Sequence, residues 1–235
     1  MQSLLKLNQV EAFIQKFHIL HDISFEVPKG EATVLLGRNG AGKTTTLRTI
    51  MGLNQVSKGS ITYKGEDIGN MNPYQIANKG IGFVPEDQGI FGGLTIEENM
   101  RVAMKKEDEE TTKRMEWVLE LFPDLKKFWK KASGQLSGGQ KQMLAIARAY
   151  VNDNDLLLID EPSKGLAPIV VEKVTESIQQ MKEQTTILLV EQNFMMASKI
   201  GDQFYIIDDG QMVHSGQMEE LKEDKAIMKK YLGIS

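Results

Sequence analysis

Residues 37–44 read GRNGAGKT, and this stretch decides which fold the chain can adopt. It fits the pattern G-x-x-x-x-G-K-[ST], in which glycines let backbone amides curl around phosphate oxygens. An apolar run, TVLL, precedes it at 33–36, and TTTLRTIMG at 44–52 follows it with a helical pattern. A strand, a glycine-rich loop and a helix in this order predict a phosphate-binding loop and not a simple turn.

The loop carries the residue types that hold a nucleotide. We expect Lys43 to reach the β- and γ-phosphates and the Thr44 hydroxyl to ligate Mg²⁺. The neighbouring backbone amides are expected to surround the phosphate oxygens. The cofactor-binding residues predicted in this stretch are Gly37, Arg38, Asn39, Gly40, Ala41, Gly42, Lys43, Thr44 and Thr45.

A second motif, LLLIDE at 156–161, places two carboxylates after an apolar run. A buried strand that ends in acidic residues is where α/β sheets hold their ligand chemistry. We expect Asp160 to hold Mg²⁺, directly or through water, and Glu161 to polarise the attacking water as general base. Alone this pattern is weak, because a strand that runs into an acidic turn gives the same letters. Beside a phosphate-binding loop it favours a catalytic site.

The hydrophobic pattern predicts an α/β fold in two parts. Apolar runs separated by helical patterns indicate a mainly parallel sheet buried on both faces, the core of a P-loop NTPase. Earlier segments alternate and end in turns, as antiparallel strands do, so we expect an N-terminal antiparallel β subdomain. The predicted core strands are 33–36, 81–84, 156–160, 187–190 and 204–207, and the predicted antiparallel strands are 4–10, 23–27 and 60–65.

Composition narrows the class of protein. The chain has 235 residues, enough for one large domain, and no cysteine, which excludes a disulfide framework and a thiolate metal site. Its net charge of −4 disfavours nucleic acid as a partner. Its apolar runs are far shorter than the roughly 20 residues of a membrane span. No secretory signal is evident, so we expect a cytoplasmic protein that serves a membrane only through a partner chain.

A third motif, LSGGQ at 136–140, lies between the phosphate-binding loop and the LLLIDE segment. With this third motif in order, the chain resembles the ATP-binding cassette family over nearly its whole length. The resemblance implies a single ATPase domain over 1–235, with a helical signature subdomain over roughly 88–152, that binds ATP and Mg²⁺. It also implies that two cassettes pair head to tail. The signature residues Ser137, Gly138, Gly139 and Gln140 would then face the γ-phosphate held by the partner's P-loop.

The chain is more similar to one branch, the Liv-type ATPase subunits of branched-chain amino acid importers. Three residues that depart from the wider family look typical of that branch, and one of them is Ala167, at the D-loop aspartate position. Glu86 stands where most cassettes have a glutamine that senses Mg²⁺ and the membrane partner, and Gln192 replaces the usual switch histidine. The resemblance makes Glu86 a metal- and nucleotide-binding residue and Gln192 a catalytic one. The similar stretches are 42–53, 84–99, 160–168, 188–193 and 231–233.

Two positions differ from that branch. Lys164 stands where the branch often has glutamate. The aromatic side chain that commonly stacks on adenine aligns near Ile14, so Phe13 or Phe17 is expected to take its place. Each phenylalanine is also compatible with a plain core position.

The sequence therefore predicts the ATPase subunit of a membrane transporter, peripheral on the inner face of the cell membrane. Its partners would be an identical or sister ATPase subunit, membrane permease subunits and, indirectly, a substrate-binding protein, with no nucleic acid. Import of branched-chain amino acids is the first hypothesis. Urea or amide import and lipid or lipopolysaccharide export are the alternatives. A non-transport nucleotide-dependent scaffold and a nucleic-acid-associated cassette protein are the hypotheses of a different class.

Overall fold

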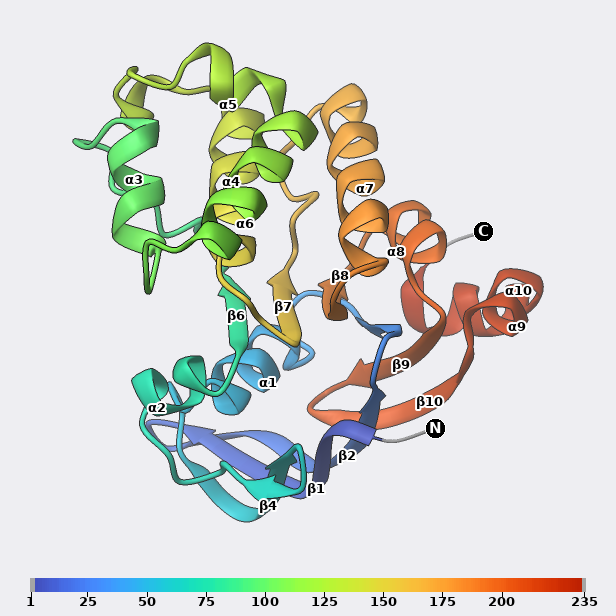
Figure 1. The fold of residues 1–235 in the computed structure, drawn as a ribbon. Helices are drawn as coiled ribbons and strands as arrows, with labels where there is room; N and C mark the ends of the chain where they lie inside the picture. The colour runs from blue at the N-terminus through green and yellow to red at the C-terminus, as the bar shows by residue number, and fades with distance from the viewer. Residues whose placement is uncertain (1–2, 234–235) are drawn as a thin grey trace.

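A six-stranded sheet forms the centre of the computed structural model, which describes residues 3–233 (Figure 1). Its strand order is β10-β9-β3-β8-β7-β6. Neighbours from β9 to β6 run parallel, and β10 runs antiparallel to β9 at one edge. This confirms the predicted, mainly parallel sheet. The strands are β3 (Ala32–Leu36), β6 (Ile81–Val84), β7 (Leu156–Asp160), β8 (Thr186–Glu191), β9 (Gln203–Asp208) and β10 (Gln211–Gln217).

The N-terminal part of the chain forms a separate antiparallel sheet, in the order β2-β1-β4-β5. The expected antiparallel β subdomain is thereby confirmed. Figure 1 shows this sheet at one end of the molecule, below α1. Its strands are β1 (Ser3–Ile14), β2 (Phe17–Pro28), β4 (Val56–Tyr63) and β5 (Glu66–Asp67).

The alternation of side chains along the core strands divides the hydrophobic interior into two clusters. On β7, Leu156 and Leu158 pack toward α1 and the antiparallel sheet. Leu157 and Ile159 pack on the opposite face, with the helices that follow β6 and β7. Because both faces of the strand are covered, its sequence is continuously apolar until the carboxylates begin.

Four α-helices and a short 3₁₀ turn come between β6 and β7 in the chain and lie at the end of the molecule opposite the antiparallel sheet (Figure 1). Pro123 follows the end of α4 and begins the next helix, since proline is tolerated in the first turn of a helix but not in its interior. The bounds of a helical subdomain at 88–152 stay a prediction. The elements are α3 (Ile96–Ala103), α4 (Glu109–Leu121), α5 (Pro123–Lys127), the 3₁₀ turn (Ser133–Gln135) and α6 (Gly138–Tyr150).

The remaining helices cover the sheet and carry the chain to its end. Helix α1 lies between the two sheets, and α7 and α8 pack against each other on the opposite face of the core sheet. Within residues 3–233, none of the helices has both the length and the apolar character that a bilayer crossing requires. They are α1 (Lys43–Ile50), α2 (Pro73–Asn78), α7 (Pro168–Lys182), α8 (Phe194–Ile200), α9 (Met218–Glu223), α10 (Lys225–Ile227) and a π-helical turn (Met228–Leu232).

Candidate active site

The loop between β3 and α1 has the backbone shape that its glycines predict. Gly42 caps α1 at φ 110°, and Gly40 has φ 82°, both in the left-handed region that glycine enters without strain. At Gly37 the reason is close approach, because a Cβ atom there would lie 2.3 Å from the Ile207 carbonyl oxygen. The loop is therefore fixed in shape at the N-terminus of a helix, where unpaired amides favour an anion.

Lys43 is buried at the start of α1, and oxygen atoms surround its ammonium group. The Nζ atom donates to the carbonyl oxygens of Gly37 at 3.0 Å and Arg38 at 3.1 Å. It also lies 2.9 Å from Glu161 Oε1, in an ion pair whose two side chains are nearly inaccessible. The phosphate-binding lysine and the expected general base are thus in direct contact.

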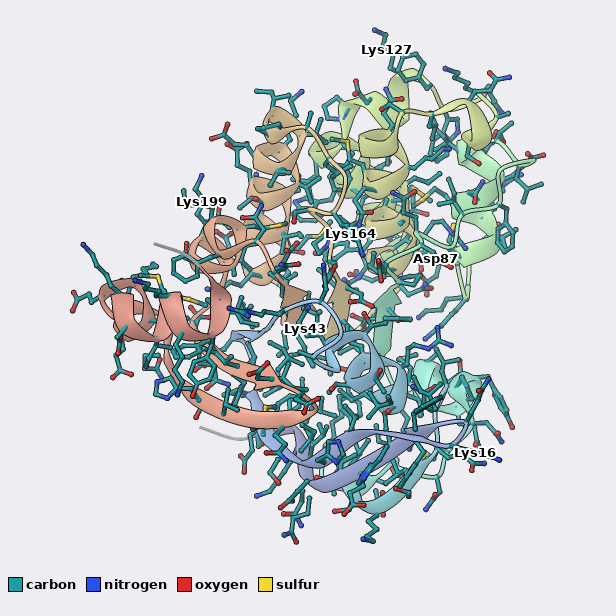
Figure 2. All side chains as sticks on the ribbon, turned by 180° about the vertical axis from the view of Figure 1, so that it is seen from behind. Lys16, Lys43, Asp87, Lys127, Lys164 and Lys199 are labelled. Carbon is teal, nitrogen blue, oxygen red and sulfur yellow. The ribbon has the colours of Figure 1, made fainter. Side chains whose placement is uncertain are left out.

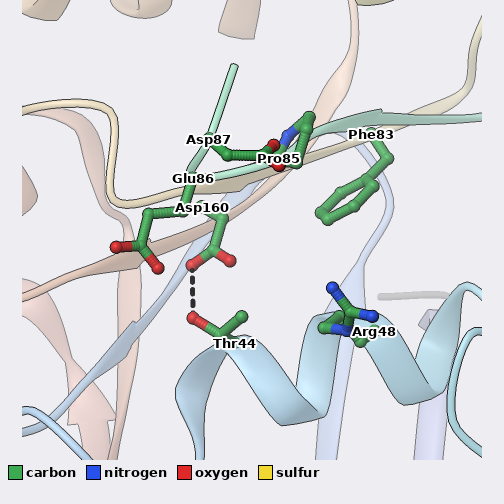
Figure 3. A pocket seen from close by; sticks show the side chains of 7 residues that line it. All are labelled: Thr44, Arg48, Phe83, Pro85, Glu86, Asp87 and Asp160. Carbon is green, nitrogen blue, oxygen red and sulfur yellow. Dashed lines mark hydrogen bonds between the residues drawn. The ribbon is translucent and has the colours of Figure 1, made fainter. Parts of the chain in front are cut away.

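Asp160 and Thr44 form the second contact of the site. The Thr44 hydroxyl donates to Asp160 Oδ1 at 3.1 Å (Figure 3). The other carboxylate oxygen, Oδ2, is buried and has no hydrogen-bond partner. Burial raises the pKa of Asp160 to about 6, and the nearby negative charges of Glu161 and Glu86 add to this effect, although the Thr44 hydrogen bond opposes it. An unpartnered buried oxygen beside a hydroxyl is a site that accepts a cation.

The oxygen atoms present fit Mg²⁺ rather than a metal held by protein alone. Mg²⁺ is usually bound through one or two carboxylates together with the phosphates of a substrate. Asp160, Thr44 and, across the same cavity, Glu86 supply hard oxygen ligands of this kind. No group of three or more histidines and acids in residues 3–233 forms a metal cage of its own.

Glu161 is held in an uncommon backbone conformation next to these groups. Its φ of 42° lies in the left-handed region, which costs a non-glycine residue of order 1–3 kcal/mol. Its N–H group donates to the Val190 carbonyl oxygen at 2.9 Å, so β8 holds this turn in place. The strained turn directs the buried carboxylate toward Lys43.

Two cavities meet at this point. One, of about 550 Å³, runs along the P-loop, and the other, of about 310 Å³, lies beside the end of β6 (Figure 3). Thr44 and Glu86 line both. The larger cavity is lined by Ile14, Ile19, Asn39, Gly40, Gly42, Lys43, Thr44, Thr45, Glu86, Glu161 and Lys164. The smaller is lined by Thr44, Arg48, Phe83, Pro85, Glu86, Asp87 and Asp160.

The LSGGQ segment lies at the start of α6 and lines neither cavity. Ser137 is the N-cap: its hydroxyl accepts from the Gln140 N–H, and Gln140 Oε1 accepts from the Ser137 N–H. Ser137 and Gly138 are exposed, whereas Gly139 is buried. A Cβ atom at Gly139 would lie 2.5 Å from Val170 Cγ1, so only glycine lets α6 and α7 approach this closely.

Comparison with known proteins decides the family. The family model described as ABC transporter matches residues 20–164. The high-affinity branched-chain amino acid transport ATP-binding protein BraG of Pseudomonas aeruginosa is 41% identical, over 98% of this chain and 100% of that protein. The chain belongs to the ABC transporter family. The ATP-binding subunits of this family are ATPases coupled to transport.

Two further comparisons agree with the ABC assignment. A probable branched-chain amino acid transport ATP-binding protein, LivF of Archaeoglobus fulgidus, is 36% identical over 98% of this chain and 99% of that protein. A crystal structure of a nucleotide-free ATP-binding cassette from an ABC transporter superposes with a TM-score of 0.84. It is 23% identical and covers 100% of both chains, which shows the ABC cassette fold.

One contact of this ABC site was not predicted from the sequence. Lys164 lines the same cavity as Lys43 and forms an ion pair with Glu86; Figure 2 labels both lysines. Its Nζ atom also lies 3.6 Å from Glu161 Oε2. The Lys164 ammonium therefore neutralises the charge of Glu86, which stands where other cassettes have glutamine. The only indication of this contact in the sequence was that Lys164 stands where the Liv branch often has glutamate.

Other predicted site residues lie farther from the nucleotide cavity. Gln192 is exposed at the turn between β8 and α8, and its contact with the γ-phosphate stays a prediction. Phe13 stacks on His18 with ring centroids 4.3 Å apart, and Phe17 is 70% exposed. Neither lines the described cavities, whereas Ile14 lines the larger one. Adenine stacking by Phe13 or Phe17 stays a prediction, and the cavity wall at this point is aliphatic.

Asp160→Asn is expected to stabilise the metal-free protein at neutral pH. The pKa of Asp160 is about 6 in the fold and 3.8 without it, so the penalty of a buried charge grows as pH rises through this range. Above pH 6 the penalty is complete, about 1–3 kcal/mol, and the neutral amide removes it. Thermal unfolding in a chelator should show a gain at pH 7.5 that shrinks at pH 4.5. An equal gain at both pH values would contradict this explanation.

Lys164→Met is expected to lower the Mg²⁺ concentration that half-saturates ATP binding. The ammonium competes with the metal for Glu86, and because this pair is exposed the change should be at most about five-fold. Without Mg²⁺, the same variant should bind ATP more weakly, since a cation near the phosphates is lost. Binding titrations with and without the metal measure both effects. Lys164→Arg is the control that keeps the charge, and it should resemble the wild type.

Proposed function

We propose that this chain is the ATP-hydrolysing subunit of an importer of branched-chain amino acids. The buried Lys43–Glu161 ion pair carries the catalytic part of this proposal, because it joins the phosphate-binding loop to a general base. The 41% identity to BraG, over 98% of this chain and 100% of that protein, supports branched-chain amino acids as the transported substrate. The proposal treats residues 1–235 as one ATPase domain with a helical subdomain at 88–152.

ATP binding rearranges the contacts of Lys43. Its ammonium exchanges the carbonyl oxygens of Gly37 and Arg38 and the carboxylate of Glu161 for the β- and γ-phosphate oxygens. Glu161 then has a free oxygen that accepts a proton from the attacking water, and its strained turn keeps that oxygen near the γ-phosphate. Gln192 donates its amide to the γ-phosphate but cannot accept a proton as histidine would.

Thr44, Asp160 and Glu86 hold the metal that accompanies ATP. Bound Mg²⁺ neutralises charge on the phosphate oxygens during transfer. The unpartnered Asp160 Oδ2 supports this role, because a buried oxygen without a donor is satisfied when a cation reaches it. Glu86 leaves its ion pair with Lys164 to take part.

The signature completes the site in a head-to-tail dimer. Ser137, Gly138, Gly139 and Gln140 line neither nucleotide cavity of their own chain, which supports their action on the partner's γ-phosphate. The amides of Gly138 and Gly139, the first two of α6, have no acceptor within the helix, so they are the groups that can donate to that phosphate. The partner is an identical or a sister ATPase subunit.

The segment after Glu86 links this chemistry to the membrane subunits. Gln88 donates to the Gly138 carbonyl at 3.4 Å and to Gln142 Oε1 at 3.2 Å, so this segment touches the signature helix. A change in the position of Glu86 would therefore be felt at α6 and in the region around 86–100, which we assign to the contact with the permease. The protein is peripheral on the inner face of the membrane, and a substrate-binding protein acts through the permease.

The alternative transporters share the ATPase chemistry. Urea or amide import comes from the same branch, whereas lipid or lipopolysaccharide exporters usually keep the glutamine and histidine that Glu86 and Gln192 replace. Identification of the membrane proteins that co-purify with the chain separates these cases. A scaffold without hydrolysis conflicts with the intact Glu161, and a nucleic-acid role with the net charge of −4.

Glu161→Gln is expected to keep ATP binding and to lower turnover by about two orders of magnitude or more, the usual loss for a general base. Because hydrolysis separates the dimer, the variant should accumulate as an ATP-bound dimer. Phosphate release and size-exclusion chromatography with ATP measure the two effects. Near-normal turnover, or a monomer in ATP, would argue against Glu161 as the base.

A mixture of two inactive variants tests whether the signature acts on the partner. Lys43→Ala removes the phosphate contact, and Gly138→Asp places a carboxylate against the γ-phosphate. A side chain fits at 138, because its Cβ would meet only Leu166, at 3.8 Å. If the signature acts in trans, each site of a mixed dimer combines the P-loop of one chain with the signature of the other. One site then has both defects and the other has neither, so mixing should restore part of the ATPase rate.

The control for this experiment is wild type mixed with Lys43→Ala, which must show that a dimer with one intact site turns over. The subunits must exchange, and a sister cassette is included if the native pair is mixed. If the control is active and the mixture of variants stays inactive, the signature does not act in trans.

A further inference from the structure

Glu191, the last residue of β8, is a buried carboxylate to which the proposed chemistry gives no role. It is 1% exposed. Burial raises its pKa, and the groups that oppose this rise are hydrogen-bond donors from Asn193, Ser163 and Gln192. A carboxylate taken out of water is costly unless its oxygens accept several hydrogen bonds.

Four donors converge on this one carboxylate. Oε1 accepts from the Ser163 backbone N–H at 2.9 Å. Oε2 accepts from the Ser163 hydroxyl at 3.0 Å, the Gln192 N–H at 3.0 Å and the Asn193 N–H at 2.9 Å. Three of these partners are backbone N–H groups, which can only donate, and the Ser163 hydroxyl is placed to donate as well, so the carboxylate acts as the acceptor for both loops. The hydrogen bonds join two loops that are separate in sequence.

Each of these loops carries a candidate catalytic residue. Ser163 lies two residues after Glu161, and Lys164 beside it contacts both Glu161 and Glu86. The other loop begins with Gln192, and Asn193 then caps α8 by accepting from the Met196 N–H at 3.2 Å. The Glu191 carboxylate is thus the common anchor of the turn after Glu161 and the turn that presents Gln192.

Side-chain packing alone does not hold the two loops together. A cavity of about 380 Å³ borders both of them, with Ser163 and Leu166 on one side and Asn193 and Met195 on the other. Met195 is 69% exposed. Where packing leaves such a space, the relative position of the loops depends on hydrogen bonds.

We propose that Glu191 is a positioning residue for ATP hydrolysis: it fixes Gln192 and the turn after Glu161 in the one arrangement in which both meet the γ-phosphate. The inference rests on the proposed function of Glu161 and Gln192. It predicts that loss of the anchor affects turnover and leaves nucleotide affinity unchanged, because the P-loop is built on β3 and α1.

Glu191→Gln is the informative variant, because the amide keeps the size of the side chain but one of its ends becomes a donor. That end faces either the N–H of Ser163 or the three donors at Oε2, so at least one of the four hydrogen bonds is lost and the anchor is weakened. We expect kcat to fall by about 10- to 100-fold, the scale of a misplacement of about 1 Å, with the dissociation constant for ATP within about two-fold of wild type. Single-turnover hydrolysis and equilibrium ATP binding give the two quantities.

A matched control separates positioning from general stability. Ile23→Val removes one methylene from the core of the antiparallel sheet and should lower the melting temperature without changing kcat. Ser163→Ala, which deletes one donor, is the second test variant and should lower kcat by a smaller factor than Glu191→Gln. It serves in its place if Glu191→Gln does not fold.

The double variant Glu191→Gln, Gln192→Ala tests whether the anchor acts through Gln192. If it does, the two losses in kcat do not multiply, and the double variant resembles the worse single one. Inactivity of wild type would overturn the proposed function itself. If wild type is active but the test variants lose stability alone, as Ile23→Val does, Glu191 is structural and the inference is wrong.

Discussion

The buried ion pair between Lys43 and Glu161 is the contact on which the rest of the site depends. A buried ammonium or carboxylate is costly unless it is paired and hydrogen-bonded, so each group needs the other when the phosphates are absent. The pairing is possible because β3 and β7 both end at the same edge of the sheet, with β8 between them. A nucleotide whose phosphates bound the Lys43 ammonium would change the surroundings of Glu161. In the proposed mechanism, ATP binding and hydrolysis are therefore linked through a single cation.

Charged side chains of both signs surround this pair. The carboxylates of Asp160, Glu161 and Glu86 lie with the cations Lys43, Lys164 and Arg48 in the two adjoining cavities. Burial is the main cause of the raised pKa of Asp160, and the negative charges of Glu161 and Glu86 add to it. If the chain binds ATP with Mg²⁺ as proposed, the phosphates would meet the P-loop and the metal would meet Asp160.

The sequence was most informative where local constraints are strongest. Strands 81–84 and 156–160 were predicted with the bounds of β6 and β7, because a strand covered on both faces must be apolar throughout. The P-loop glycines were evident because the loop conformation admits few other residues. The antiparallel β10 at the edge of the sheet was not predicted, since its residues 211–217 are largely polar and exposed.

Contacts between side chains that are far apart in the chain could not be predicted from the sequence. The pairing of Lys164 with Glu86 joins residues 78 positions apart. Near the P-loop, alternation along β1 decides which neighbour faces the cavity, and a shift by one residue exchanges Ile14 with Phe13. Glu191 ends an apolar strand as Asp160 does, which was a usable signal. Its four donors come from two loops whose meeting only the fold reveals.

The close contact between α6 and α7 connects these features across the molecule. Gly139 of the signature packs on Val170, two residues after Pro168 starts α7, and α7 follows directly from the turn that Glu191 anchors. Because a Cβ atom at 139 would lie 2.5 Å from Val170 Cγ1, the starts of α6 and α7 are in close contact, and a shift of one would press on the other. In a head-to-tail dimer, that helix end would face the partner's phosphate. The proposed general base of one chain would then be connected, through this packing, to the donors that the same chain offers to the other site.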